Sequence, residues 1–167
     1  MRSFTRAASG DSRAGLSFIE ILVSVMVIGI LAAVASPIYS TSLLKYRAEV
    51  TAQRIQQDIM QTQRVARQTN STRSIAFDFS DHSYVISGVQ SLDRVSQPYR
   101  VSLSLPPYQI RFSSLATAAL PATPLPSVAI AFDRFGMADQ GIVVTVGEGS
   151  IQKQVHVAPT TGRVSIP

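Results

Sequence analysis

The sequence predicts an α+β fold in which one long N-terminal helix precedes an antiparallel β-sheet region. A helical pattern reaches to about residue 70, and apolar residues alternate with polar ones after residue 73. The length of 167 residues fits one domain. Charged residues make up only 15% of the chain, against about 25% in a typical soluble domain. Part of the chain is therefore expected to contact something other than water.

The apolar excess lies in one segment, Leu16–Ala35, whose only charged residue is Glu20. A helix of this length spans about 30 Å, the thickness of the hydrocarbon layer of a bilayer. Residues 1–15 before it carry an excess of arginine. By the positive-inside rule these residues stay in the cytoplasm, and the chain beyond Pro37 lies across the membrane. We expect a single-pass anchor.

Two simple interpretations of this segment each leave one feature unexplained. A cleaved secretory signal would use Ala33-Val34-Ala35 and release a periplasmic β-domain that begins at Ser36, but the apolar run exceeds the usual 7–15 residues. A plain transmembrane anchor fits the length. It does not explain Glu20, because a carboxylate inside the hydrocarbon costs about 2.5–3.5 kcal/mol on insertion scales.

A third interpretation rests on the stretch Ala14-Gly15-Leu16-Ser17-Phe18-Ile19-Glu20 and the apolar run behind it. This stretch resembles the class III signal of type IV pilins and type II secretion pseudopilins, although Phe is more usual than Leu at position 16. The resemblance implies a pilin-like fold and a prepilin peptidase that cleaves between Gly15 and Leu16 and methylates Leu16. It also implies that Glu20 meets the amino terminus of a neighbouring subunit and sets the register of assembly.

The helix is expected to continue beyond the membrane. Pro37 lacks a backbone N–H and should kink the helix without ending it. An apolar stripe then recurs at helical spacing, with the charged residues on other faces. The stripe comprises Leu44, Ala48, Ala52, Ile55, Ile59 and Ala66, and the charged residues are Arg47, Glu49, Arg54, Asp58 and Arg64. We expect a helix from about Ser17 to Gln68, ended by the turn residues that begin at Asn70.

These patterns divide the chain into four parts: a leader at 1–15, a transmembrane and assembly helix at 16–36, its amphipathic continuation at 37–70 and a periplasmic β-sheet domain at 71–167. Alternation in the last part predicts strands with one buried face. Their residues are Ile75, Phe77 and Phe79; Tyr99, Val101, Leu103 and Leu105; Ile110 and Phe112; Val128, Ile130 and Phe132; Ile142–Val146 and Val155–Val157 around a Gly147-Glu148-Gly149 turn; and Val164 with Ile166. Asp81-His82 predicts a turn, and the proline-rich stretch Leu115–Ser127 predicts an exposed loop.

Two short motifs narrow the resemblance. Phe132-Asp133-Arg134-Phe135-Gly136 and Thr161-Gly162-Arg163-Val164 are similar to the C-terminal region of the GspH/FimT family. This implies a minor pseudopilin of a type II secretion system in the bacterial inner membrane, with prepilin peptidase and other pseudopilins as partners. The alternative is a FimT- or FimU-like minor type IV pilin in pilus assembly, adhesion or DNA uptake.

Nucleic acid is a disfavoured partner. Some FimT-like pilins take up DNA through a Gly-Arg-x-Arg element, and here Gly162-Arg163 keeps the first arginine while Ser165 replaces the second. Half of the charge that would neutralise phosphates is therefore missing. Arg163 remains a candidate for a weak DNA contact, and other arginines would have to share its face. They are Arg73, Arg94, Arg100, Arg111 and Arg134.

No motif for catalysis is present. The chain has no cysteine, which excludes disulfides, thiolate metal ligands and cysteine nucleophiles. His82 and His156 fall in an expected turn and an expected strand, and no nucleotide-binding or hydrolase fingerprint accompanies them. Asp133 and Asp139 flank Gly136 as turn residues and do not form a cluster of oxygen ligands. We expect a structural protein without cofactor or metal.

Overall fold

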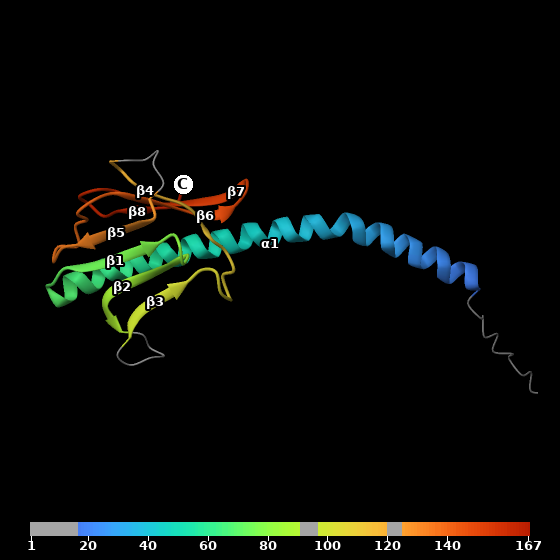
Figure 1. Cartoon of the computed structure of the whole chain (residues 1–167), viewed down its shortest axis with the longest axis horizontal. Coiled ribbons are helices and arrows are strands. Elements are labelled where there is room, and N and C mark those ends of the chain that lie inside the picture. Colours follow the sequence, from blue (N-terminus) through green and yellow to red (C-terminus); the bar gives the residue numbers. More distant parts are fainter. Residues whose placement is uncertain (1–16, 91–96, 120–124) are drawn as a thin grey trace, which may run out of the picture. The chain divides into compact units, whose positions relative to one another are not determined.

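The structure is a computed structural model that describes residues 17–90, 97–119 and 125–167 (Figure 1). It divides into two compact units, one that ends at Tyr39 and one from Ser40 to Pro167. Helix α1 covers Phe18–Thr69 and belongs to both units. The described residues also form eight strands. They are β1 (Arg73–Asp78), β2 (Ser83–Gln90), β3 (Pro98–Ser102), β4 (Phe112–Thr117), β5 (Ser127–Phe132), β6 (Ile142–Glu148), β7 (Ile151–Val157) and β8 (Val164–Ser165).

The sequence explains both ends of α1. At its start, the carbonyl of Ser17 accepts hydrogen bonds from the N–H groups of Glu20 and Ile21, at 3.0 and 3.2 Å. At its end, Asn70 has a φ of 50°, and Ser71 donates its N–H to the carbonyl of Ala66 at 3.2 Å. A left-handed residue followed by such a bond is the Schellman termination, which asparagine tolerates better than most residues. The helix expected from about Ser17 to Gln68 is confirmed, and it continues through Pro37.

The strands form two antiparallel sheets. One has the order β3-β2-β1-β5 and the other the order β4-β6-β7-β8. In Figure 1 the strands lie alongside the C-terminal part of α1. The β6–β7 hairpin pairs Ile142 with Val157 at one end and Glu148 with Ile151 at the other, so the expected turn around Gly149 is confirmed.

The core lies between the sheets and the second half of α1. The buried helix residues follow the expected stripe, and Ala48, Ala52, Ile55, Ile59 and Ala66 have no exposed surface. Strand residues that alternate along the chain meet them, with Ile75, Phe77, Ile130 and Phe132 at most 1% exposed. The α+β class, with one long helix on antiparallel sheets, is therefore confirmed.

Three local expectations were wrong. Leu115 begins no loop, because it is fully buried inside β4; a register shift between Phe112 and Ser114 breaks the alternation there. Leu105 lies outside β3 and is 60% exposed, since the chain turns back at this point and Ile110 donates its N–H to the carbonyl of Leu103. Asp58 faces the core and not another side of the helix, and it is only 2% exposed.

Candidate functional site

The first part of α1 presents a largely apolar surface. From Phe18 to Val34, its large apolar side chains are between 49% and 80% exposed. A surface of this kind is unfavourable in water, and apolar patches of such size mark sites of interaction with proteins or membranes. The helix is also long and apolar enough to cross a bilayer, with a mean hydropathy of 2.7 over an 18-residue window.

One acidic residue stands in this surface. Glu20 lies in the first turn of α1 and is exposed. Its carbonyl accepts a hydrogen bond of 2.7 Å from the hydroxyl of Ser24. A negative charge in a first turn is favoured by the partial positive charge of the helix N-terminus. Gly15 and Leu16 lie outside the described residues, so cleavage and methylation there stay predictions, as does a kink at Pro37.

A buried polar cluster holds the second part of α1 against β2 and β3. Tyr84 of β2 donates its hydroxyl to Asp58 Oδ2 at 2.5 Å, and Arg54 Nε donates to the same oxygen at 3.2 Å. Arg54 also donates to the hydroxyl of Tyr99 on β3. Burial raises the pKa of the Asp58 carboxyl, and the hydrogen bonds from Tyr84 and Arg54 oppose this only in part. Burial likewise raises the pKa of Tyr84.

A second group of contacts ties the end of α1 to the two motifs that resemble the GspH/FimT family. Gln63 donates its side-chain amide to the carbonyl of Gly136 at 3.2 Å and to that of Gly162 at 2.8 Å. Arg67 donates to the carbonyl of Phe135 at 2.9 Å. The motifs, separated by residues 137–160 in sequence, therefore meet at one helix side chain.

Both motif glycines are required by this close approach. Gly136 and Gly162 have positive φ values of 75° and 64°, which L side chains rarely adopt. A Cβ at Gly162 would lie 2.3 Å from the Gln63 amide nitrogen, and one at Gly136 would lie 2.2 Å from Arg67 Nε. The glycines let the loops reach the helix.

Asp133, Asp139 and His82, which the sequence offered as candidate site residues, each accept hydrogen bonds from nearby backbone N–H groups. Asp133 Oδ1 accepts from the N–H groups of Phe135 and Met137, and Asp139 Oδ1 accepts from that of Ala131. His82 accepts the N–H of Phe112 on its Nδ1. In the described ranges, no three His, Asp or Glu side chains gather in a way that could hold a metal ion.

The arginines considered for DNA binding come from different elements. Arg100 of β3 forms a salt bridge of 2.7 Å with Asp81, and Arg134 stacks over the ring of Phe135 at 4.9 Å. Arg163 is exposed and precedes β8. Arg94 lies outside the described residues.

Sequence reasoning missed the buried polar residues of α1 and the role of Gln63. Thr51, Asp58 and Thr62 are all buried and fall at the helical spacings of seven and four that the apolar stripe also uses. This spacing was the available signal for Asp58. Gln63 gave none, because its partners are backbone carbonyls far along the chain.

Comparison with solved structures decides the fold. The minor pseudopilin EpsH from the type 2 secretion system of Vibrio cholerae superposes with a TM-score of 0.51 at 12% identity, over 72% of this chain and 96% of that chain. This chain shares the fold of EpsH. The pilin-like fold expected from the class III signal is thus confirmed. The type IV minor pilin FimU of Pseudomonas aeruginosa (strain PAO1) is also similar, with a TM-score of 0.49 at 12% identity, over 72% of this chain and 87% of that chain.

The likeness to EpsH concerns the fold. No protein-family model and no curated protein sequence matches the chain. In this chain the second part of α1 packs on two sheets, and the first part of α1 belongs to a separate unit with an exposed apolar surface.

Proposed function

We propose that this chain is a prepilin-like minor pseudopilin, a non-enzymatic structural subunit of the pseudopilus of a type II secretion system. The observation that supports this most is the apolar first part of α1 with Glu20 in its first turn, attached to a sheet unit with the fold of EpsH. The apolar surface contacts the lipid bilayer before assembly and the helices of neighbouring subunits after assembly.

The proposed maturation follows from the leader. Prepilin peptidase cleaves between Gly15 and Leu16 at the cytoplasmic face of the bacterial inner membrane and methylates the new amino terminus. Residues 16–36 then hold the subunit in that membrane as a single span, with residues 71–167 in the periplasm. Glu20 lies about one helical turn from the new terminus, close enough for an ion pair with the amino group of a neighbouring subunit.

The proposed role of Glu20 is to set the axial register. A carboxylate in an apolar environment is strongly unfavourable alone, and losing the partner of a buried charge costs about 3–5 kcal/mol. When two helices pack so that Glu20 of one meets the amino terminus of the other, both charges are neutralised. When one helix is shifted along the other, both charges stay unpaired.

Incorporation into fibres tests this proposal. In cells that assemble pseudopili, we expect Glu20→Gln to be cleaved normally and to be lost from sheared fibres. The matched control is Glu49→Gln, which removes an acidic residue from the second part of the same helix and should leave incorporation unchanged. Equal amounts of Glu20→Gln and unaltered protein in the fibres would contradict the register role.

A minor type IV pilin is the second candidate function, and its DNA-uptake form would have to use the exposed Arg163. Fluorescence anisotropy of residues 40–167 with labelled duplex DNA tests this DNA-uptake form. A minor pseudopilin should show no binding at physiological salt. Micromolar affinity that falls steeply with salt, and that Arg163→Ala reduces, would favour DNA uptake.

A further inference from the structure

The edge of β7 is only partly occupied. Strand β8 pairs with β7 at just two positions, where His156 meets Ser165 and Val157 meets Val164. The other edge of β7 is fully paired with β6, from Ile151 to Val157. The part of β7 from Ile151 to Gln154 therefore has no paired strand among the described residues, and Ile166, which follows β8, comes next in the register opposite Val155.

The backbone directions along this edge follow from two hydrogen bonds. The N–H of Ala158, just after β7, donates to the carbonyl of Arg163 at 2.9 Å and therefore points toward β8. The N–H of Gly147 in β6 donates to the carbonyl of Arg111 at 3.0 Å and therefore points away from β7. In an antiparallel sheet these directions alternate along each strand. Gln152, opposite Gly147, and Gln154 therefore direct their N–H and C=O groups outward, and no described residue binds them.

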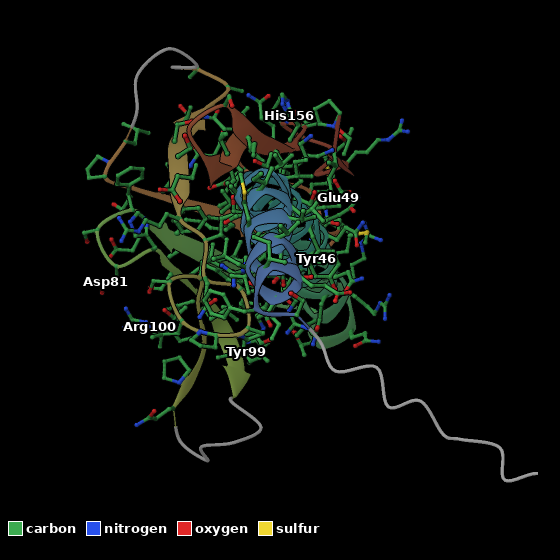
Figure 2. All side chains as sticks on the ribbon, turned by 90° about the vertical axis from the view of Figure 1, so that its right-hand side faces the viewer. Tyr46, Glu49, Asp81, Tyr99, Arg100 and His156 are labelled. Atoms are coloured by element: carbon green, nitrogen blue, oxygen red, sulfur yellow. The ribbon has the colours of Figure 1, made fainter. Side chains whose placement is uncertain are left out.

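An apolar groove of about 540 Å³ adjoins this edge. It lies between the beginning of the second unit's helix and the start of β7, and Figure 2 labels two of its helix residues, Tyr46 and Glu49. Its lining residues are Lys45, Tyr46, Ala48, Glu49, Ser150, Ile151, Gln152 and Lys153. The groove offers room for side chains of a strand added to β7.

The charge of the groove indicates what fits. Lys153 Nζ forms a salt bridge of 2.8 Å with Glu49, which lowers the pKa of that carboxyl. Lys45 has no salt bridge in the part of the chain that the structure describes, so the lining carries one positive charge in excess. Two copies of this chain joined edge to edge about Lys153 would place like charges directly opposite each other, which is unfavourable.

We propose that the open edge of β7 binds an extended acidic segment of another protein as an added strand. The segment forms backbone hydrogen bonds with Gln152 and Gln154, inserts apolar side chains beside Ile151 and places a carboxylate opposite Lys153. Strand addition of this kind takes its affinity from the main chain and its specificity from alternate side chains. The interaction does not require assembly of a fibre.

A synthetic peptide of sequence Thr-Val-Thr-Asp-Thr-Val-Thr provides the probe. With Asp opposite Lys153, one of its two Val residues lies opposite Ile151 on the helix side of the sheet, and the other reaches the end of the chain's own β8 segment. We expect titration of the ¹⁵N-labelled full chain in detergent micelles to shift the backbone amide resonances of Gln152 and Gln154. The same peptide with Lys in place of Asp should bind at least about fivefold more weakly.

Substitution of one edge residue tests the hydrogen bonds. Gln154→Pro removes the outward N–H and leaves the bonds between β7 and β6 in place, because Gln154 does not contribute to them. We expect it to weaken peptide binding about fivefold, as the loss of one hydrogen bond does. Gln154→Ala keeps the N–H and should bind like the unaltered chain. Thermal unfolding of both variants verifies that they are folded.

The proposal would be overturned if the amide resonances of Gln152 and Gln154 did not shift up to the solubility limit of the peptide. It would also be overturned if Gln154→Pro and Gln154→Ala bound the peptide equally, or if the Asp and Lys peptides bound equally. A fourth contrary result would be shifts at this edge that depend on protein concentration when no peptide is present. The last would assign the edge to a second copy of this chain. None of them bears on cleavage or fibre incorporation, so the proposed function stands or falls separately.

Discussion

Asp58 is a carboxyl group enclosed between a helix and a sheet, and two donors converge on one of its oxygens. Arg54 and Tyr84 compensate part of the cost of removing the charge from water, yet the pKa remains raised. Removing one partner of such a pair lowers the free energy of unfolding by more than the intact pair contributes to it, because the remaining buried charge is left uncompensated. Stability should therefore respond both to pH and to loss of the donors.

The raised pKa of Asp58 makes a prediction about pH. The folded chain binds a proton at Asp58 more readily than the unfolded chain, whose carboxyl titrates at about 4. The free energy of unfolding attributable to this group is therefore highest below that pH and falls as the pH rises through the raised pKa. Urea denaturation at a series of pH values measures this slope. We expect Asp58→Asn to lack it, and an identical pH dependence of both proteins would contradict the assignment.

Tyr84 should matter through its hydroxyl. We expect Tyr84→Phe to lower the free energy of unfolding by about 1.5–3 kcal/mol, because a hydrogen bond to a charged group is lost inside the core. Phe79→Ala is not a suitable control for the loss of a hydroxyl group, because it removes the packing of an aromatic ring as well. Tyr46→Phe is suitable, as Tyr46 is 66% exposed and its hydroxyl should contribute little. Equal changes in the free energy of unfolding for the two substitutions would show that the hydrogen bond between Tyr84 and Asp58 does not stabilise the fold.

The end of α1 acts as a connecting element because Gln63 binds the carbonyls of two loops. Gly149 supplies a matched control for the close approach at Gly162. The two glycines have similar positive φ values, 58° and 64°, but nothing lies within 4 Å of a Cβ at Gly149. We expect Gly149→Ala to cost about 1 kcal/mol from backbone strain and Gly162→Ala about 1–2 kcal/mol more. Chemical denaturation measures both, and equal costs would contradict the role of Gln63.

The elements differ in how far the sequence predicted them. The helix and the strands around Ile75 and Val128 follow from periodicity, because each has one buried face. The strand at Ile142 follows from its continuous apolar run, and it is buried on both faces from Val144 to Val146. Strand β2 was not predicted. Phe112 was expected in a strand, but the rest of β4 from Leu115 onward was assigned to a loop, because the register shift between Phe112 and Ser114 disrupts the alternation. Pairing order and the contacts of Gln63 depend on residues far apart in the chain, which no local pattern encodes.

The candidate site divides in the same way. Glu20 was identified because a lone acidic residue in an apolar run is unusual and because its offset from Gly15 matches the class III signal. Asp58 was placed on the wrong face of the helix, since charge alone suggests exposure. A buried charge is recognised only when its partners, here Arg54 and Tyr84, are seen together.

On the scale of the whole molecule, the chain consists of an apolar helix unit and a folded sheet unit. This division predicts that the two respond differently to the same change. Ile59→Ala removes a fully buried side chain and should cost about 2–5 kcal/mol of unfolding free energy, whereas Leu31→Ala, at 64% exposure, should leave it unchanged. Unfolding of the full chain in detergent measures both. A similar loss for Leu31→Ala would contradict the division.

The proposed assembly role depends most on processing of the chain at Leu16. Mass spectrometry of the N-terminal peptide of the mature protein, purified from cells that contain prepilin peptidase, tests it most directly. We expect a peptide that begins with N-methylated Leu16. A peptide that begins at Ser36 would identify an ordinary secretory signal, and an intact Met1 would identify a plain membrane anchor; either result would contradict the assembly role proposed for this chain.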